Sequence, residues 1–154
     1  VRAHVRKPLR GLDVVAYYGC LLVRPAEVTA FENPDNPVLM GELLEALGAT
    51  VHSWSYATEC CGGGLALTKP KVAAKLVERL ADRAKEAGGR AIVTSCPLCQ
   101  ANLEMRQGSR VARIPIFYFT ELMGLAFGLE QSASWWPQHL VNPKPLLHEA
   151  GLMD

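Results

Sequence analysis

Short apolar runs alternate along this chain with longer amphipathic stretches. The short runs are residues 12–17, 50–56, 91–94 and 114–119, and each has the length and apolar content of a buried strand. Between them, apolar side chains recur every three or four positions, as they do in helices that cover a sheet. The pattern therefore predicts strands and helices in alternation.

The first amphipathic stretch carries boundary signals at both ends. Asn36 has the side chain of a helix cap, and Pro37 is suited to the first helical position because its missing N–H has no partner there anyway. The helix is predicted to continue through Leu39 to Leu47 and to end at Gly48.

A longer helix is predicted to begin at Thr68 and to end at Gly88. Its charged residues share one face, and its apolar face consists of Val72, Ala73, Leu76, Val77, Leu80, Ala84 and Ala87. Another helix is expected from Thr120 to about Leu129. The alternation predicts an α/β fold: an open parallel four-stranded sheet with helices on both faces, Rossmann- or flavodoxin-like.

Composition supports one folded domain. The chain has 154 residues, of which 49% are hydrophobic and 20% charged, enough to bury a core. Sixteen Lys and Arg balance fifteen Asp and Glu, so charge gives no reason to expect a nucleic acid partner. We also expect no transmembrane segment and no secretory leader. Because the chain begins at Val1 rather than Met, we expect a piece of something longer.

The residues most informative about function are the five cysteines, Cys20, Cys60, Cys61, Cys96 and Cys99. An odd number leaves one unpaired in any complete disulfide framework, and a core of this size does not need disulfides to fold. We therefore expect reduced cysteines in the cytoplasm, at a metal or redox site.

The cysteines all follow predicted strands. Cys20 comes after the first strand, Cys60 and Cys61 after the second, and Cys96 and Cys99 after the third. Because parallel strands end at the same edge of a sheet, where ligands bind, we expect all five cysteines to converge there.

Convergent thiolates select zinc, Cu(I) or iron–sulfur clusters. Cys96 and Cys99 form a CxxC motif at a predicted helix start, which by itself is typical of a redox pair or of half a zinc site. The glycines at 62–64 allow the backbone to approach a bulky group. A zinc site or a cubane cluster uses four cysteines, so the fifth indicates an unusual cluster or a cysteine kept for chemistry.

The cysteine pattern, with the stretches YYGCLLVRP (17–25), CCGGG (60–64) and VNPKPLL (141–147), resembles the cysteine-rich CCG domain. This domain occurs twice in the catalytic B subunit of heterodisulfide reductase, and the three stretches resemble its second copy. We therefore expect residues 1–154 to be a single CCG domain, the C-terminal half of a longer two-domain subunit.

The resemblance implies that all five cysteines bind a noncubane [4Fe-4S] cluster, and that the subunit cleaves a heterodisulfide reductively, as a CoB-CoM heterodisulfide reductase-like oxidoreductase does. A lone half would be incomplete. The implied partners are a second CCG domain in the same chain or a homodimer mate, a ferredoxin-like C subunit, a flavin-containing A subunit and a disulfide substrate. The expected location is the cytoplasm, or the periphery of a membrane complex. In a sample handled in air we expect the cluster to be lost, with zinc or disulfides in its place.

An alternative stays open at this point. Similar domains serve succinate, glycolate, lactate and glycerol-3-phosphate oxidoreductase complexes, where the domain passes electrons on. This chain would then be a non-catalytic relay module that holds zinc or a cubane cluster. Replacing each cysteine in turn discriminates between the two interpretations, because a four-ligand site tolerates the loss of one of the five.

Other residues each have two interpretations. Arg24 is either an anion-binding residue or a solvated loop arginine, and Glu59 either relays protons or is an ordinary loop carboxylate. Trp135 and Trp136 either dock a partner or fold back over the sheet. The histidines lack metal-site spacing, so we expect surface or packing roles for His4, His52, His139 and His148.

Overall fold

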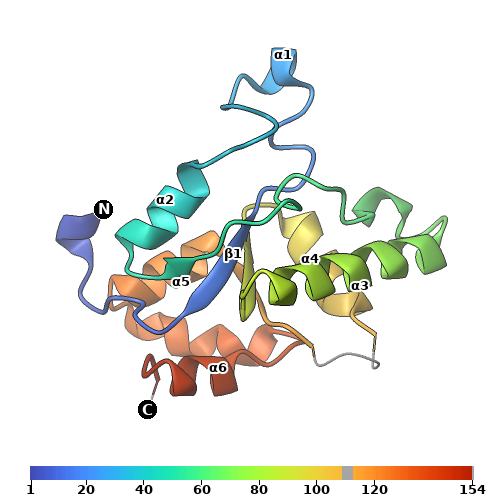
Figure 1. Ribbon diagram of the computed structural model, residues 1–154. Helices are drawn as coiled ribbons and strands as arrows, with labels where there is room; N and C mark the ends of the chain where they lie inside the picture. The colour runs from blue at the N-terminus through green and yellow to red at the C-terminus, as the bar shows by residue number, and fades with distance from the viewer. Residues whose placement is uncertain (109–112, 154) are drawn as a thin grey trace.

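The computed structural model describes residues 1–108 and 113–153 and contains a four-stranded parallel sheet (Figure 1). The strands are β1 (Asp13–Tyr17), β2 (Thr50–Val51), β3 (Ala91–Thr94) and β4 (Ile116–Tyr118), in the spatial order β2-β1-β3-β4. The register pairs Val15 with Ile92 and Val93 with Phe117. The predicted parallel α/β fold is confirmed.

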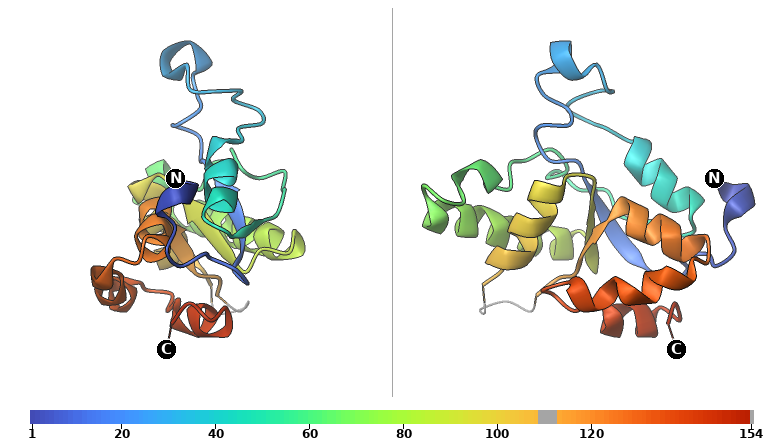
Figure 2. Two further views of the ribbon diagram at one scale, coloured as in Figure 1. Left: turned by 90° about the vertical axis from the view of Figure 1, so that its left-hand side faces the viewer. Right: turned by 180° about the vertical axis from the view of Figure 1, so that it is seen from behind.

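Helices cover both faces of the sheet. One face, which includes Val14, Val93 and Phe117, packs against α2 (Leu39–Ala46), α5 (Phe119–Ala126) and α6 (Lys144–Glu149). The other, which includes Val15 and Ile92, packs against α3 (Pro70–Glu86) and α4 (Pro97–Arg106). Accordingly, α2 and α3 flank the sheet on opposite sides (Figures 1 and 2). Successive residues of one strand thus enter different cores, as strand geometry requires.

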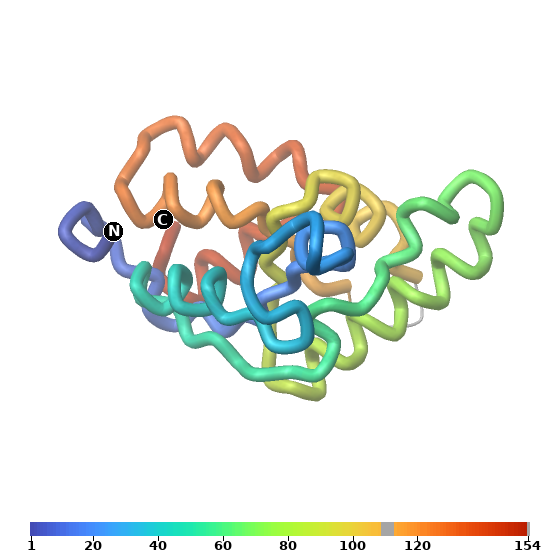
Figure 3. Tube along the Cα trace, turned by 90° about the horizontal axis from the view of Figure 1, so that it is seen from above, coloured from blue at the N-terminus to red at the C-terminus, as the bar shows by residue number. Residues whose placement is uncertain are grey.

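A protrusion, residues 20–38, continues from the end of β1 and carries the short helix α1 (Ala26–Thr29). It rises above the rest of the molecule in Figure 1 and lies over its middle in the view from above (Figure 3). The remaining helical turns are η1 (Arg2–His4), η2 (Gly63–Leu65), η3 (Glu130–Ser134) and η4 (Trp136–Gln138). Within the described ranges, no helix is long and apolar enough to cross a membrane.

Two strands are shorter than predicted. The second ends at Val51 instead of continuing to residue 56, because the indole Nε1 of Trp54 donates to the carbonyl of Ala16 (2.8 Å) where a ladder bond would otherwise form. The fourth begins at Ile116, because the side-chain amide of Gln107 pairs with both backbone groups of Ile114 (2.8 and 2.9 Å).

The predicted start of α2 is wrong. Asn36 is exposed and does not cap the helix; instead, the carboxylate of Glu32 accepts the N–H groups of Val38 (2.7 Å) and Leu39 (3.3 Å). The predicted end is confirmed, since Gly48 follows the helix with a φ of 98°.

The other helix boundaries are close to prediction. α3 begins at Pro70 after Lys69, without the side-chain cap expected from Thr68. Four residues of the predicted apolar face are fully buried: Ala73, Val77, Leu80 and Ala84. α5 begins at Phe119 and ends at Ala126, three residues before the predicted end.

Candidate metal centre

All five cysteines line one small cavity at the edge of the sheet where β1 and β3 end. The convergence predicted from strand order is therefore present, while the role of the sulfurs as ligands stays a prediction. The thiols are free; Cys61 and Cys99 are buried, and Cys60 is exposed. The remaining lining residues are Tyr18, Leu21, Gly63, Gly64 and Leu98.

The N-terminus of α4 presents two of the sulfurs. Cys96 caps the helix: its Sγ accepts the N–H of Cys99 (3.4 Å), and Pro97 takes the first helical position. The CxxC motif thus lies at a helix start, as predicted, where the dipole and the amide groups favour thiolates. On the facing loop, Gly62 N–H donates to Cys60 Sγ (3.3 Å).

The buried pair Cys61 and Cys99 shares a hydrogen bond between sulfurs 3.5 Å apart. This bond lowers the pKa of Cys61 to about 6, against the opposing effect of burial. The same bond, burial and the charge of Cys61 raise the pKa of Cys99 above its usual range. Burial and the neighbouring Cys60 also raise the pKa of Cys20. A bound cation would favour the thiolate forms of these cysteines, and its binding would release protons.

The side chains of α4 hold the CCGGG loop. Asn102 Nδ2 donates to the carbonyl of Cys61 (2.8 Å), and Arg106 Nε donates in turn to Asn102 Oδ1 (2.9 Å). The same guanidinium donates to the carbonyl of Ala66 (2.8 Å). Neither Asn102 nor Arg106 was among the site residues predicted from the sequence. Asn102 and Arg106 lie three and seven positions after Cys99 on the same helix. This spacing places them on the helix face that carries Cys99, and it is the signal that could have identified them.

Tyr17 is buried in the same core cluster as Cys61 and Cys99, outside the lining of the cavity. Its hydroxyl donates to the carbonyl of Glu59 (2.6 Å). Burial raises the pKa of this phenol far above its usual range, and the charges of the surrounding cysteines, Cys61 and Cys99 foremost, add to the rise. Tyr17 therefore stays neutral beside the thiolates and keeps its proton for the loop carbonyl.

Close approach to the segment of residues 96–99 explains two glycines. A Cβ at Gly19, where φ is 68°, would lie 3.1 Å from Cys99 Sγ. A Cβ at Gly63 would lie 3.0 Å from Leu98 Cγ and 3.4 Å from Cys61 Sγ. At Gly62, φ is 79° and a Cβ would meet Leu76 of α3 at 2.9 Å, while the approach of its backbone to a bulky group stays a prediction.

The structure places Arg24 and Glu59 outside the lining of the cavity. Arg24 pairs with Asp35 across the exposed protrusion (3.1 Å), and the carboxylate of Glu59 lies 3.8 Å from Arg79 of α3. Both arrangements favour the ordinary loop interpretation. His52 likewise pairs with Asp13 (2.8 Å).

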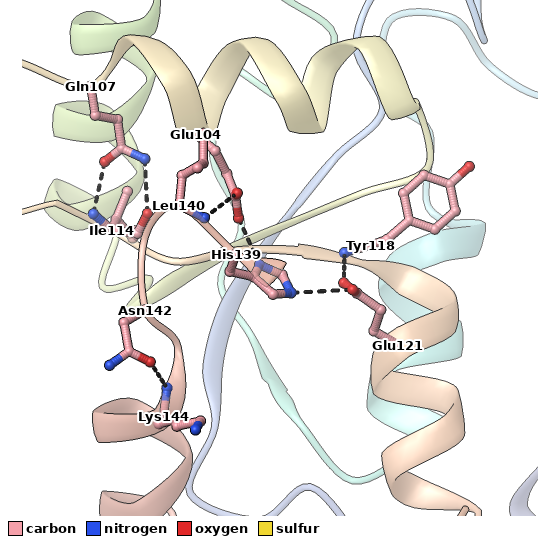
Figure 4. A network of polar contacts seen from close by, with 9 residues as sticks. All are labelled: Glu104, Gln107, Ile114, Tyr118, Glu121, His139, Leu140, Asn142 and Lys144. Carbon is pink, nitrogen blue, oxygen red and sulfur yellow. Dashed lines mark hydrogen bonds and ion pairs between the residues drawn. The ribbon is translucent and has the colours of Figure 1, made fainter. Parts of the chain in front are cut away.

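His139 lies at the centre of a buried polar network (Figure 4). Its Nδ1 is 2.6 Å from Glu104 of α4, and its Nε2 is 3.1 Å from Glu121 of α5. Burial lowers the pKa of the imidazole, but the two carboxylates outweigh it and raise the pKa of His139 to about 9. Glu104 also accepts the N–H of Leu140 (2.9 Å), and Glu121 that of Tyr118 (2.6 Å). The network ties α4, α5 and the C-terminal segment together, which confirms a packing role.

Trp136 folds back over the sheet, as one of the two interpretations proposed. It is 1% exposed and packs edge-on against Phe117, with ring centroids 5.9 Å apart. Trp135 is partly buried against the same core. A docking role for Trp136 is therefore wrong.

The donor set, five cysteine sulfurs around one cavity, fits an iron–sulfur group. Within residues 1–108 and 113–153, no three cysteine, histidine or acidic side chains are arranged to hold a single ion. The five sulfurs surround a cavity instead, with glycines at its wall and backbone N–H groups directed at two sulfurs. Thiolates around such a space can bind several iron atoms at once.

Fold and site together define a parallel α/β domain that gathers five cysteines at the carboxyl ends of its strands. The family model of the CCG cysteine-rich domain matches residues 14–104, which include all five cysteines. The chain belongs to this family.

Curated relatives come from two kinds of complex. The chain is 32% identical over 135 residues to the membrane anchor of the 8-methylmenaquinol:fumarate reductase of Wolinella succinogenes, a match that covers 84% of the chain and 48% of the relative. It is 31% identical over 140 residues to an Archaeoglobus profundus protein described as similar to the B subunit of heterodisulfide reductase. This match covers 84% of the chain and 47% of the relative. It is 29% identical over 137 residues to the B subunit of the ferredoxin:CoB-CoM heterodisulfide reductase of Methanosarcina mazei. This match covers 83% of the chain and 45% of the relative. The chain thus spans about half the length of the relatives it matches.

Proposed function

We propose that this chain is the iron–sulfur redox domain of a heterodisulfide reductase-like catalytic subunit, and that it binds a noncubane [4Fe-4S] cluster. The ligands would be Cys20, Cys60, Cys61, Cys96 and Cys99. The observation that carries the proposal is that all five sulfurs line one cavity in a chain of the CCG family.

The chain's own residues would prepare this site in three ways. The N–H groups of Gly62 and Cys99 donate to sulfurs and so favour their thiolate forms. Asn102 fixes the loop that carries Cys60 and Cys61. Tyr17 stays neutral and holds the same loop through the carbonyl of Glu59. When bound, the cluster would supply one of the two electrons that reductive cleavage of a disulfide at the exposed rim requires, and the cluster of a second CCG domain would supply the other.

The proposed function includes a partner that completes the site. The chain has half the length of its relatives, and Leu21 and Leu98 are exposed on the rim of the cysteine cavity (72% and 50%). We propose that a second CCG domain, in the same chain or in a homodimer mate, covers this rim. A ferredoxin-like C subunit and a flavin-containing A subunit would deliver the electrons in the cytoplasm.

A relay role is the second candidate, and the relative from the fumarate reductase complex supports it. In that case the chain would pass electrons through a cubane cluster within a complex at a membrane, or would be a module that zinc stabilises, without cleaving a disulfide.

Metal analysis of anaerobically purified chain tests the proposal. We expect about four irons and similar sulfide per chain, with a broad visible absorption band. About one zinc and no sulfide, persisting after reconstitution with iron and sulfide, would contradict it.

Single Cys→Ser variants then test the number of ligands. Each of the five is expected to lose or alter the cluster spectrum, whereas Leu98→Ile, within the same CxxC motif, is expected to leave it unchanged. A cysteine whose replacement has no effect would favour the four-ligand relay site.

A further inference from the structure

Exposed lysines and apolar side chains form one surface just after the CCGGG loop. It covers the turn between η2 and α3 and the first two turns of α3, at the end of the molecule opposite the N-terminus (Figures 1 and 3). We call it the lysine surface, and its members, all exposed, are Leu67, Lys69, Lys71, Val72 and Lys75.

An ordered backbone presents these side chains to solvent. The N–H of Lys69 donates to the carbonyl of Leu65 (2.8 Å), and the guanidinium of Arg106 donates to the carbonyl of Ala66 (2.8 Å). Leu67, which lies within this fixed turn, is nevertheless 93% exposed. Val72 lies on the solvent face of α3 and is 44% exposed. The lysines therefore surround two apolar side chains that this chain leaves uncovered.

The charge of the lysine surface is not neutralised within the chain. Residues 60–77 include three lysines and no acidic residue. Further along α3 the cations are engaged, since Arg79 lies 3.8 Å from Glu59 and Arg83 pairs with Glu86. The three lysines, by contrast, take part in no ion pair with any residue that the structure describes. Their charge is available to a partner.

The helix itself does not favour lysines at these positions. Lys69 is the N-cap of α3 and Lys71 lies in its first turn, which contains no acidic residue. The dipole of a helix favours acidic side chains at this end and opposes cations. A departure from such a local rule is expected where a surface has a function. The arrangement therefore favours a role in binding over a role in the stability of the helix.

The place of the lysine surface narrows the class of partner. Gly63 and Gly64 line the cysteine cavity, and Leu67 follows Gly64 by three residues. Complexes between electron carriers have small interfaces, in which opposite charges steer the encounter. A carrier benefits from docking beside the sulfurs, whereas a nucleic acid or a membrane gains nothing from it. Two copies of this chain would repel each other at this surface.

We propose that the lysine surface docks an acidic protein that carries one electron. In the docked pair the reduced carrier loses one electron and the cluster at the neighbouring cysteines gains it, without formation of a covalent bond. The electron transfer rests on the proposed function, whereas the docking does not.

Titration of the anaerobically reconstituted chain with a plant-type [2Fe-2S] ferredoxin, an acidic one-electron carrier, tests the docking. We expect saturable binding at about 0.01 M salt and its loss at about 1 M, because the screening length falls from about 30 Å to about 3 Å. The variant Lys71→Glu/Lys75→Glu is expected to bind about tenfold more weakly. Arg2→Glu/Arg10→Glu, at exposed arginines outside the surface, changes the net charge by the same amount and is expected to have little effect.

A second pair of variants tests the apolar part of the surface. Leu67→Ser leaves the charge unchanged and is expected to weaken binding about fivefold. Leu140→Ser, at another exposed leucine, is expected to leave the affinity unchanged. Thermal unfolding checks that all four variants fold.

Three results would overturn the docking. They are absence of binding, equal weakening by the lysine and arginine variants, and binding of phosphatidylserine vesicles or duplex DNA through Lys71 and Lys75 without binding of ferredoxin. The last result would assign the surface to a membrane or to a nucleic acid.

Stopped-flow oxidation of reduced ferredoxin by the chain tests the electron transfer. We expect Lys71→Glu/Lys75→Glu to slow it about tenfold at equal iron content. Ferredoxin that binds and is not oxidised by the iron-loaded chain would overturn the transfer. The titration is repeated on chain without iron, where docking is expected to persist. A chain that never binds iron would thus contradict the proposed function and leave the docking result intact.

Discussion

Asn102 shows how much of the site depends on residues that are not ligands. Its side chain is 4% exposed and has hydrogen bonds on both sides, to the Cys61 carbonyl and from Arg106. Sequence analysis identified the sulfurs because cysteine is rare and chemically distinctive. A single asparagine in a helix carries no such signal, and its role emerges only when the loop after β2 is placed against α4.

Replacement of Asn102 by alanine is expected to lower the free energy of unfolding by about 1 to 3 kcal/mol, because it leaves the Cys61 carbonyl and Arg106 without a partner. The reconstituted cluster should also bleach faster in the presence of a chelator. Urea unfolding and visible absorption measure the two effects. Gln100→Ala, on the same helix but lining a different cavity, is the control; equal effects of the two variants would refute a specific role.

His139 makes stability depend on pH. Its pKa is raised from 6.5 to about 9 in the folded chain, which corresponds to about 3 kcal/mol of stabilisation when the ring is protonated. Because the folded pKa is the higher one, this contribution is complete below pH 6.5 and is lost as the pH rises through about 9.

We therefore expect His139→Gln to destabilise the chain strongly at pH 6 and much less at pH 10, as measured by urea unfolding at both pH values. His148→Gln, at an exposed histidine, should have little effect at either. Equal destabilisation by His139→Gln at both values would show that the ring acts by packing alone.

At the scale of elements, helix α2 shows where local signals mislead. Asn36-Pro37 is a good helix start in isolation, but the helix begins two residues later because Glu32 reaches across the turn to its free N–H groups. A carboxylate at a helix N-terminus also interacts favourably with the dipole. Which of two nearby polar residues caps the helix depends on the path of the loop, and pattern rules do not contain that path.

Glu32→Ala is expected to lower the free energy of unfolding by about 1 kcal/mol, because two N–H groups at the start of α2 lose their acceptor. Asn36→Ala, the change that would matter if the sequence-based cap were correct, is expected to have almost no effect. Thermal unfolding of the two variants measures the difference. If Asn36→Ala destabilised the chain more than Glu32→Ala, Asn36 would be the cap, as predicted from the sequence.

At the scale of the whole molecule, the exposed apolar rim of the cysteine cavity indicates an interface. Leu21 and Leu98 both line the cavity and are exposed. Burial of apolar surface drives association.

We expect the isolated chain to self-associate, and the double variant Leu21→Asp/Leu98→Asp to shift it toward monomer in sedimentation velocity. Leu140→Asp, at a leucine that is 60% exposed but away from the rim, is the control. A chain that stays monomeric at high concentration, or a control variant with the same effect, would argue against this interface.

The sequence by itself determined the fold class and the gathering of the cysteines. Both follow from local rules: apolar periodicity defines strands and helices, and parallel strands end at one edge. Only the tertiary structure decided how far each strand extends, which carboxylate caps α2, and that Asn102 and Tyr17 hold the loop that carries Cys60 and Cys61. Those features depend on contacts between residues far apart in the chain, and such contacts leave no periodic trace in the sequence.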